Sequence, residues 1–381
     1  MKKRIVVLGC GLVGRTLACD LAADPDFDVA VADVSRENLN HVAATTKNLA
    51  TIQADLGTPS AIQAVIKDFD VVVGAMPSTL GLQTLKAVID GGKSFSDISF
   101  MAEDPMTLDD LARQRSATVV FDCGVAPGLA NMIIGHCHAQ LDETTDVSYY
   151  VGGLPKHPQW PYKYKAPFAP ADVVEEYTRP ARLVENGRQV VKPALSEPEL
   201  IDFPQVGTLE AFNTDGLRSL LHTVKAANMR EKTLRYPGHA ELMRVFRETG
   251  LFSKVEVDAG GKKVRPLDVT SRLLFSKWRL EPGEEEFTIL RVIVEGAKAR
   301  STPALHLRPL RRIRRGDGPT FDGENDGISQ RDHGPVDRPR RVPPPRRLPA
   351  GNRRRRAGNA RPHDPRTFAT RRAPDGRISI Y

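Results

Sequence analysis

Three glycines and one aspartate close to the start of the chain have types and a spacing that suit a chemical task. Gly9, Gly11 and Gly14 follow an apolar run, Ile5–Leu8, and Asp33 ends a second apolar run nineteen positions after the third glycine. Gly9 permits a tight turn, Gly11 lets backbone amides approach a pyrophosphate, and Gly14 lets a helix pack closely on a sheet. Asp33 can then accept hydrogen bonds from the adenosine ribose hydroxyls. The spacing predicts a dinucleotide-binding site.

The same motif bears on the choice of dinucleotide. The backbone amides at the start of the expected helix, those of Leu12 and Val13, would face the phosphates. The carboxylate of Asp33 repels a 2′-phosphate, which favours NAD. Arg36, three residues further on, keeps NADP as the alternative.

Strands and helices alternate after Asp33, which indicates an α/β fold with a doubly wound parallel sheet of the Rossmann type over residues 1–125. Ligands of such sheets bind beyond the carboxyl ends of the strands. Residues at these predicted strand ends are therefore expected to contact the cofactor: Asp55, Met76, Pro77, Ser78, Asp97, Asp122, Cys123 and Gly124. Aspartate is also a common turn former and helix cap, and for Asp55 and Asp97 that interpretation stays open.

The expected elements of this region come directly from the apolar runs and the turn residues between them. After Asp33, the expected strands are Leu49–Ala54, Asp70–Ala75, Ser94–Ile98 and Thr118–Phe121. The expected helices are Thr58–Lys67, Leu80–Ile89 and Leu108–Gln114.

The pattern changes after Thr145. A strand is expected at Asp146–Val151, followed from Gly152 by a long loop rich in proline and aromatic residues that extends to Pro170. Further strand-like runs occur at 181–183, 189–191 and 287–294, and helical runs occur near 171–177 and 239–248. We expect an α+β substrate and dimerisation domain over residues 126–300, with the substrate in the cleft between the two domains.

The composition excludes several classes of protein. No apolar run reaches membrane-spanning length, so a cytoplasmic protein without a membrane anchor is expected. The four cysteines form no C-x-x-C pair and are expected to be free thiols. His136, Cys137 and His138 lack a third ligand nearby, so they are interpreted as a helix face, and no metal is expected.

The formal net charge of +8 is unevenly distributed. Residues 301–381 contain 20 arginines, no lysine and 8 acidic residues, which leaves residues 1–300 mildly acidic. A run such as Arg353–Arg356 is typical of arms that bind nucleic acid. Because the tail has almost no interleaved aromatic residues, nucleic acid is not the expected partner.

Six ordered segments carry a resemblance to a known family. They are the glycine motif, Phe121–Met132 (FDCGVAPGLANM), Tyr150–Pro155 (YVGGLP), Tyr177–Gly187 (YTRPARLVENG), Leu209–Gly216 (LEAFNTDG) and Thr233–Glu241 (TLRYPGHAE). From Met1 to about Gly296 the chain resembles the saccharopine dehydrogenase family. Within it, the likeness is greatest to members that oxidise the ε-amine of lysine.

The resemblance implies a reaction. Lysine would be oxidised with NAD to an imine, which water converts to aminoadipate semialdehyde and ammonia. The sibling reaction makes or breaks saccharopine, a secondary amine. In both, a hydride passes between the nicotinamide and a carbon that bears nitrogen. The resemblance also implies a small amino-acid substrate and a homodimer or larger homo-oligomer, and a protein that binds NAD without turnover is the rival hypothesis.

Two residues of the last segment are candidates for roles in that reaction. An amine must be neutral to release hydride, so a general base is expected, and His239 is the first candidate. The alternative for His239 is a helix N-terminal residue that follows a turn. Arg235 either clamps the substrate carboxylate with two hydrogen bonds or pairs with an acid of its own domain.

Two further groups match segments that, in the family, lie close to the substrate. Asn213, Thr214 and Asp215 occupy a substrate-facing loop, where Asp215 could hold the amino group of lysine, although an Asx turn explains the same residues. Tyr164 and Lys165 match a segment that lies over the cleft. Surface packing of a proline-rich loop is the alternative for this pair.

The tail has the composition that a GC-rich gene yields out of frame, with 12 prolines and no periodic apolar segment. Permitted codons for His306–Arg314, read one base later, give Thr-Tyr-Asp-Leu-Tyr-Asp-Glu-Tyr, close to a strand of the family. Thr320–Ile328 can give Pro-Ser-Met-Ala-Arg-Thr-Thr-Gly-Tyr, which is like its closing motif. We predict a single-base slip between about Gly296 and His306, a disordered tail, an exposed apolar patch and poor activity.

Overall fold

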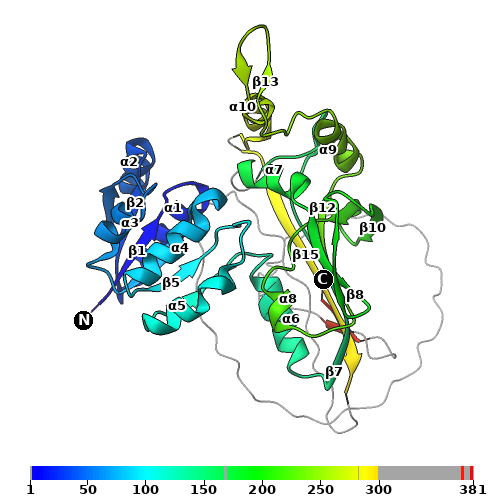
Figure 1. The fold of residues 1–381 in the computed structure, drawn as a ribbon, viewed down its shortest axis with the longest axis horizontal. Coiled ribbons are helices and arrows are strands. Elements are labelled where there is room, and N and C mark those ends of the chain that lie inside the picture. Colours follow the sequence, from blue (N-terminus) through cyan, green and yellow to red (C-terminus); the bar gives the residue numbers. More distant parts are fainter. Residues whose placement is uncertain (1, 167–169, 282, 299–369, 373–377, 381) are drawn as a thin grey trace, which may run out of the picture. The chain divides into compact units, whose positions relative to one another are not determined.

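The computed structural model describes residues 2–166, 170–281, 283–298, 370–372 and 378–380. Two sheets contain most of the described strands (Figure 1). The N-terminal sheet is formed by residues before 121, and the C-terminal sheet begins after residue 142. The predicted domain boundary at 125/126 therefore falls between the last strand of the first sheet and the helix α6 (Leu129–His138).

The N-terminal sheet has six parallel strands in the order β3-β2-β1-β4-β5-β6. Its strands are β1 (Lys3–Leu8), β2 (Phe27–Asp33), β3 (Leu49–Gln53), β4 (Val71–Gly74), β5 (Ser94–Asp97) and β6 (Val119–Val120). The order reverses at β1, which lies between β2 and β4. In doubly wound sheets the ligand crevice opens at this reversal, so the loop after β1 is at the expected place. The predicted fold class is confirmed.

Helices connect the parallel strands of this sheet. They are α1 (Leu12–Ala23), α2 (Arg36–Thr45), α3 (Pro59–Ile66), α4 (Gly81–Asp90) and α5 (Asp109–Gln114), with short 3-10 helices η1 (Ser78–Leu80) and η2 (Pro105–Leu108). The expected elements agree with these within two residues at each end, except that α2 was not expected. Its first residue could have been predicted from Ser35, a common N-cap residue, which accepts a hydrogen bond from the backbone N–H of Asn38.

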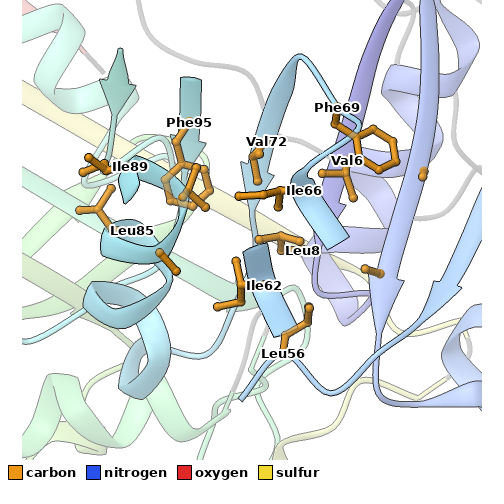
Figure 2. Close-up of a cluster of buried hydrophobic side chains, with 14 of the residues drawn as sticks. Val6, Leu8, Leu56, Ile62, Ile66, Phe69, Val72, Leu85, Ile89 and Phe95 are labelled. Atoms are coloured by element: carbon orange, nitrogen blue, oxygen red, sulfur yellow. The ribbon is translucent and has the colours of Figure 1, made fainter. Parts of the chain in front are cut away.

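Apolar side chains cover both faces of the N-terminal sheet. On one face, Val6 and Leu8 of β1 pack with Ile62 and Ile66 of α3 and with Leu85 of α4 (Figure 2). The alternate residues of β1 point to the other face and pack under α1 and α2. Burying each such side chain contributes roughly 1.5–3 kcal/mol. This explains why the strand is a continuous apolar run.

The C-terminal sheet is larger and mostly antiparallel. Among the described residues it contains β7 (Glu143–Pro155), β8 (Ala181–Glu185), β9 (Arg188–Lys192), β10 (Glu199–Phe203), β11 (Gly207–Asn213), β12 (Asn228–Arg235), β15 (Glu286–Ala297), β16 (Thr370–Arg372) and β17 (Ile378–Ile380). A separate hairpin is formed by β13 (Val257–Asp258) and β14 (Lys263–Val264). The helices are α6, α7 (Pro170–Thr178), α8 (Leu220–Thr223), α9 (His239–Glu248) and α10 (Pro266–Trp278).

Three clusters of buried side chains hold this second part together. Helices α6 and α8 pack on β7, β12 and β15 through residues such as Ile134, Tyr149 and Leu290. Helices α7, α9 and α10 meet around Trp278, which is fully buried. A third cluster includes Leu234 of β12. The two helical groups therefore cover different stretches of the sheet.

The prediction of a loop from Gly152 was wrong for its first four residues. β7 continues to Pro155, which pairs with Glu286 of β15. A Cβ on Gly152 would lie 2.6 Å from the backbone oxygen of Leu234. Glycine at this position therefore allows β7 and β12 to approach each other closely, and it does not form a turn. Glycine in a strand marks such an approach.

The tail contains two short strands, which the prediction of a disordered segment did not include. β17 pairs with β15, and β16 pairs with β17. The remaining predictions for the tail, the frame slip among them, concern residues that lie outside the described part of the chain. No helix among the described residues is long and apolar enough to span a membrane.

Candidate functional site

The loop between β1 and α1 has three glycines with three different surroundings. Gly9 has φ +98°, and a Cβ there would lie 2.5 Å from the backbone oxygen of Ala75. A Cβ on Gly14 would lie 2.0 Å from the backbone oxygen of Gly9. A Cβ on Gly11 would meet no protein atom within 4 Å. The fold itself therefore requires glycine at 9 and 14, whereas glycine at 11 only keeps free space in front of the helix.

The start of α1 fits a phosphate group. Gly11 is the N-cap and has no side chain to cap the helix, and the first turn contains no acidic residue. The N–H groups of the first turn, including those of Leu12 and Val13, lack partners within the helix. A helix N-terminus attracts anions, and at Gly11, the N-cap of this helix, a Cβ would meet no protein atom within 4 Å. The residues present therefore fit a dinucleotide pyrophosphate.

Asp33 connects the two loops at this edge of the sheet. One carboxylate oxygen accepts from the backbone N–H of Cys10 at 2.6 Å, and the other accepts from that of Ser35 at 2.7 Å. Each carboxylate oxygen has two acceptor sites, so both can also accept a ribose hydroxyl. The backbone N–H groups of Cys10, in the glycine loop, and of Ser35 thus hold the Asp33 carboxylate in position.

Two of the other strand-end residues have partners of their own. Asp55 is exposed and accepts from the backbone N–H of Gly57 at 2.9 Å, as its alternative interpretation as a turn former requires. Ser78, which follows Met76 and Pro77 and starts η1, is 6 % exposed. Ser78 is hydrogen-bonded to Asp172 of α7. The loop after β4 therefore contacts the second part of the chain.

Asp97 is a buried acid at the end of β5. Its side chain is 1 % exposed and accepts a hydrogen bond from Ser99. A Cβ on Gly74 would lie 2.2 Å from one carboxylate oxygen of Asp97, and a Cβ on Gly81 would lie 2.7 Å from the hydroxyl of Ser99. Two glycines therefore make room for this polar pair. Burial raises the pKa of Asp97 to about 6, against the opposing effect of Ser99.

Asp122, after β6, forms a buried ion pair with Arg218 of the second part. The Nε of Arg218 lies 2.7 Å from Oδ1 of Asp122, and both side chains are 2 % exposed. Burial raises the pKa of Asp122, while Arg218 acts in the opposite direction. Cys123 donates its backbone N–H to the backbone oxygen of Asp97 at 3.0 Å, and Gly124 accepts from Leu129 at the start of α6. These residues join the end of the first sheet to the second part.

A second arginine, which the sequence analysis did not identify, reaches the same edge. Arg179 donates to the backbone oxygens of Phe100 and Met101 at 3.2 and 3.3 Å. Its guanidinium carbon lies 4.4 Å from the centre of the Phe100 ring, and that of Arg218 lies 5.1 Å from it. The sequence offers one indication of it. Arg179 and Arg182 both lie in the Tyr177–Gly187 segment, which carries part of the family resemblance.

The loop of Asn213, Thr214 and Asp215 is buried and bound within its own domain. Both carboxylate oxygens of Asp215 accept from Arg182 at 2.8 Å. Thr214 donates to Glu231 at 2.6 Å, and the amide nitrogen of Asn213 donates to Glu197 at 2.9 Å. In this structure Asp215 pairs with a protein guanidinium and does not present a free carboxylate to an amino group.

His239 lies in the interior of the second part rather than at the crevice. It is 2 % exposed, and its Nδ1 lies 2.7 Å from the backbone oxygen of Tyr162. Nδ1 must donate there, so Nε2 accepts from the hydroxyl of Tyr177 at 2.9 Å. Burial, with the nearby charge of Arg235, lowers the pKa of His239 to about 3. Both ring nitrogens are occupied, which disagrees with the prediction of a general base and matches the alternative of a helix N-terminal residue.

Arg235 also takes its alternative role. Its Nη2 lies 2.5 Å from Glu176 of α7, its Nε donates to Tyr177 at 3.3 Å, and its guanidinium carbon lies 4.5 Å from the centre of the Tyr164 ring. The side chain is 3 % exposed. An arginine enclosed in this way pairs with an acid of its own domain and does not clamp a substrate carboxylate.

Tyr164 and Lys165 line a surface cavity of about 570 Å³ together with Trp160 and Tyr162. Tyr164 is 3 % exposed. The ammonium of Lys165 is occupied by Glu284 at 3.1 Å and by the backbone oxygen of Arg279. The structure thus places this pair beside a surface cavity rather than at the ends of β5 and β6.

Two groups of residues therefore come together: Asp33 with the glycine loop, and the segments after β5 and β6 with Arg179 and Arg218. Both groups lie at the carboxyl ends of the parallel strands, where such a sheet binds a dinucleotide. Asp97 has a pKa at which a carboxyl group exchanges protons near neutral pH. Among the described residues no group of three or more histidines, cysteines or acids is arranged to hold a metal ion.

Comparison with protein families gives two matches along the chain. Residues 5–120 match the saccharopine dehydrogenase NADP-binding domain, and residues 124–317 match the saccharopine dehydrogenase C-terminal domain. The junction between the two matches lies next to the predicted domain boundary.

Individual proteins with similar sequences are larger than this chain. A saccharopine dehydrogenase [NADP(+), L-glutamate-forming] of Pyricularia oryzae is 25 % identical over 67 % of the chain, which spans 59 % of that protein. A mitochondrial α-aminoadipic semialdehyde synthase of Mus musculus is 25 % identical over 70 % of the chain, which spans 30 % of it. Among solved structures, an apo saccharopine dehydrogenase (L-Glu forming) from Saccharomyces cerevisiae has a TM-score of 0.60 at 19 % identity, covering 77 % of this chain and 81 % of that one. The similarity to this yeast structure shows that the chain has the same fold.

Two glycine substitutions separate folding from cofactor binding. Gly14→Ala should destabilise the protein by about 1–3 kcal/mol, because the new Cβ meets the backbone of Gly9. Gly11→Ala should leave the thermal midpoint unchanged and weaken dinucleotide binding by about tenfold or more, equivalent to about 1.4 kcal/mol. Thermal melts and calorimetric titration with NAD measure the two effects. Unchanged NAD affinity in Gly11→Ala would contradict the assigned site.

Asp97→Asn tests the buried carboxyl group through the pH dependence of stability. The raised pKa means that the protonated acid favours the folded state, a contribution that is complete below pH 3.8 and is lost as the pH rises through about 6. The amide in the variant does not titrate, so the stability of the variant has no such loss as the pH rises. The variant should therefore equal the wild type near pH 4 and exceed it by about 3 kcal/mol at pH 8, as measured by urea unfolding. A difference that does not change with pH would rule out this environment for Asp97.

Proposed function

The chain belongs to the saccharopine dehydrogenase family, and from this premise we propose that it is a nicotinamide-dependent oxidoreductase with lysine 6-dehydrogenase activity. The observation that supports the proposal is that the dinucleotide loop and the buried acids Asp97 and Asp122 lie at the carboxyl ends of one parallel sheet. A reacting carbon held at this edge would be next to both a hydride acceptor and a proton acceptor.

The proposed reaction begins with the ε-amine of lysine. The ammonium form gives one proton to the protein, and the neutral amine then gives a hydride from its adjacent carbon. The bound nicotinamide supplies the hydride acceptor. The resulting iminium adds water and releases ammonia, which leaves the aldehyde. Among the acids at the crevice, Asp97 is our candidate for accepting the first proton, because its pKa of about 6 is close to the working pH.

Saccharopine is the second candidate substrate. The fungal relative is named for forming glutamate from saccharopine with NADP(+), and the murine relative is named as an aminoadipic semialdehyde synthase. Oxidation of a secondary amine needs the same hydride transfer and the same proton acceptor. A third possibility is a protein that binds NAD and is inactive because of the altered C-terminus predicted from the sequence.

For the cofactor we propose NAD. The Asp33 carboxylate, held by Cys10 and Ser35, would face a 2′-phosphate with a negative charge. NADP remains the alternative, because the matching family domain is described as NADP-binding and Arg36 lies three residues after Asp33. The cytoplasmic location, the homodimer or larger assembly and the frame slip are still predictions. The gene sequence tests the frame slip directly.

The activity is tested by supplying the purified protein with lysine, saccharopine or diamines, each with NAD and with NADP. Reduction of the nicotinamide, followed at its near-ultraviolet absorbance band, should be fastest with lysine and NAD. Faster reduction with saccharopine would select the second candidate. If no amine gives reduction while NAD binds in calorimetry, the protein binds the dinucleotide without turnover and the proposed activity is rejected.

Asp33→Asn tests the cofactor proposal. The amide keeps one acceptor oxygen and removes the charge, so the ratio of NADP affinity to NAD affinity should rise by about tenfold or more, which corresponds to about 1.4 kcal/mol. Calorimetric titration with each dinucleotide gives the ratio. Asp55→Asn is a matched control, since Asp55 is an exposed turn former in which the same change should leave the ratio alone. An unaltered ratio in Asp33→Asn would remove the basis for preferring NAD.

A further inference from the structure

The aromatic ring of Phe100, just after β5, lies against two guanidinium groups of the second part. The guanidinium carbons of Arg179 and Arg218 lie 4.4 and 5.1 Å from the centre of the ring. In the described part of the chain, the other rings with a guanidinium group at such a distance each have one, and they are Phe69, Tyr164 and Phe203. Phe100 is therefore placed to act on two cations at once.

The two cations are largely buried and lie close together. The side chain of Arg218 is 2 % exposed, and that of Arg179 is 10 % exposed. Each donates through Nη1 to the same acceptor, the backbone oxygen of Met101, at 2.5 Å from Arg218 and 3.3 Å from Arg179. Two groups that share one acceptor cannot lie far apart. Their like charges therefore repel each other in surroundings of low dielectric constant.

The carboxylates nearby compensate for these charges only in part. Asp122 lies 2.7 Å from Nε of Arg218. Glu175 lies 3.7 Å from Arg179, beyond the length of a good hydrogen bond. Burial lowers the pKa of Arg179, the charge of Arg218 acts in the same direction, and Asp215 acts against them. A further source of negative potential beside the two arginines would therefore stabilise them.

The face of an aromatic ring supplies such a potential. Its quadrupole makes the face negative, and the attraction for a cation is stronger where both groups are removed from water. Phe100 is half-buried, and its backbone oxygen also accepts from Nη2 of Arg179 at 3.2 Å. The ring and the backbone of one residue thus act together on Arg179, and the ring also lies against Arg218.

The position of Phe100 links the two arginines to an acid of the candidate site. Phe100 lies three residues after Asp97, our candidate for the proton acceptor. Between them, Ser99 donates to the carboxylate of Asp97. The backbone oxygen of Asp97 accepts from the backbone N–H of Cys123 at 3.0 Å. The short segment from Asp97 to Met101 is therefore fixed at its start by the end of the parallel sheet and at its end by the two arginines.

We propose that Phe100 is a positioning residue for the proposed reaction. Its ring holds the guanidinium groups of Arg179 and Arg218 side by side, and this anchors the segment after β5 that begins with the carboxylate of Asp97. The inference rests on the proposed function, because that function assigns the first proton to Asp97. A leucine or methionine fills much of the volume of the ring and has no negative face, so the electrostatic role of the ring can be separated from its packing.

The kinetic test uses the amine that the wild type oxidises fastest. Phe100→Leu should lower kcat by about tenfold or more, because a small displacement of a reacting group is costly in rate. KM for NAD should stay the same, since Asp33 and the glycine loop form a separate group of contacts. Phe100→Tyr keeps the aromatic face and should retain a kcat close to that of the wild type. Phe100→Met takes the place of Phe100→Leu if the latter does not fold.

Phe203→Leu is the matched control. It removes a buried ring whose centre lies 4.0 Å from the guanidinium carbon of Arg291, in the C-terminal sheet, and it should leave kcat unchanged. A kcat in Phe100→Leu equal to that of the wild type would overturn the proposal. An equal loss in Phe100→Tyr would do the same, because that variant keeps the aromatic face.

A double-mutant cycle measures the contact of the ring with the guanidinium group without turnover. Arg179→Gln removes one of the two charges, so Phe100→Leu should lower the thermal midpoint by less in that background than in the wild type. Phe203→Leu should lower it equally in both backgrounds. Equal effects of Phe100→Leu in both would reject the proposal even if the enzyme is active. If the cycle shows the interaction and no amine is oxidised, the proposed activity fails and the positioning of the arginines by Phe100 is supported.

Discussion

The buried ion pair between Asp122 and Arg218 is the interaction on which the crevice depends. Taking both charges out of water is costly, and removing either partner would leave an uncompensated charge in the interior. The pair joins the end of β6 to the segment after β11, two regions 96 residues apart in sequence. Phe100 and Asp97 are then enclosed between the strand ends and the arginines of the second part.

The N-terminal half of the fold was predictable because its rules are local. The glycine spacing, the apolar run of β1 and the acid at Asp33 fall within one short segment, and the alternation of strands and helices repeats after it. The C-terminal sheet was less visible. β12 contains Glu231, Lys232 and Arg235 in buried positions, so it has no apolar alternation, and each of these charges has a partner in a distant part of the chain.

The same distinction applies to the candidate site. Asp33 and the glycines were identified from spacing, because their neighbours are set by the backbone. The predicted roles of His239, Arg235 and Asp215 depended on free side chains, and each of these residues instead has a partner in a distant segment. The contact of Arg179 with Phe100 could not be predicted from the sequence, because Phe100 precedes it by 79 positions and no local pattern links the two.

The surroundings of Gly74 and Gly81 have a consequence for the interpretation of mutational screens. Neither residue has a functional group, yet a side chain at either would collide with Asp97 or Ser99. A screen that records only loss of activity would score these glycines as functional positions and would assign chemistry to residues that supply none. Their contribution is volume: the acid can occupy its position only because two side chains are absent.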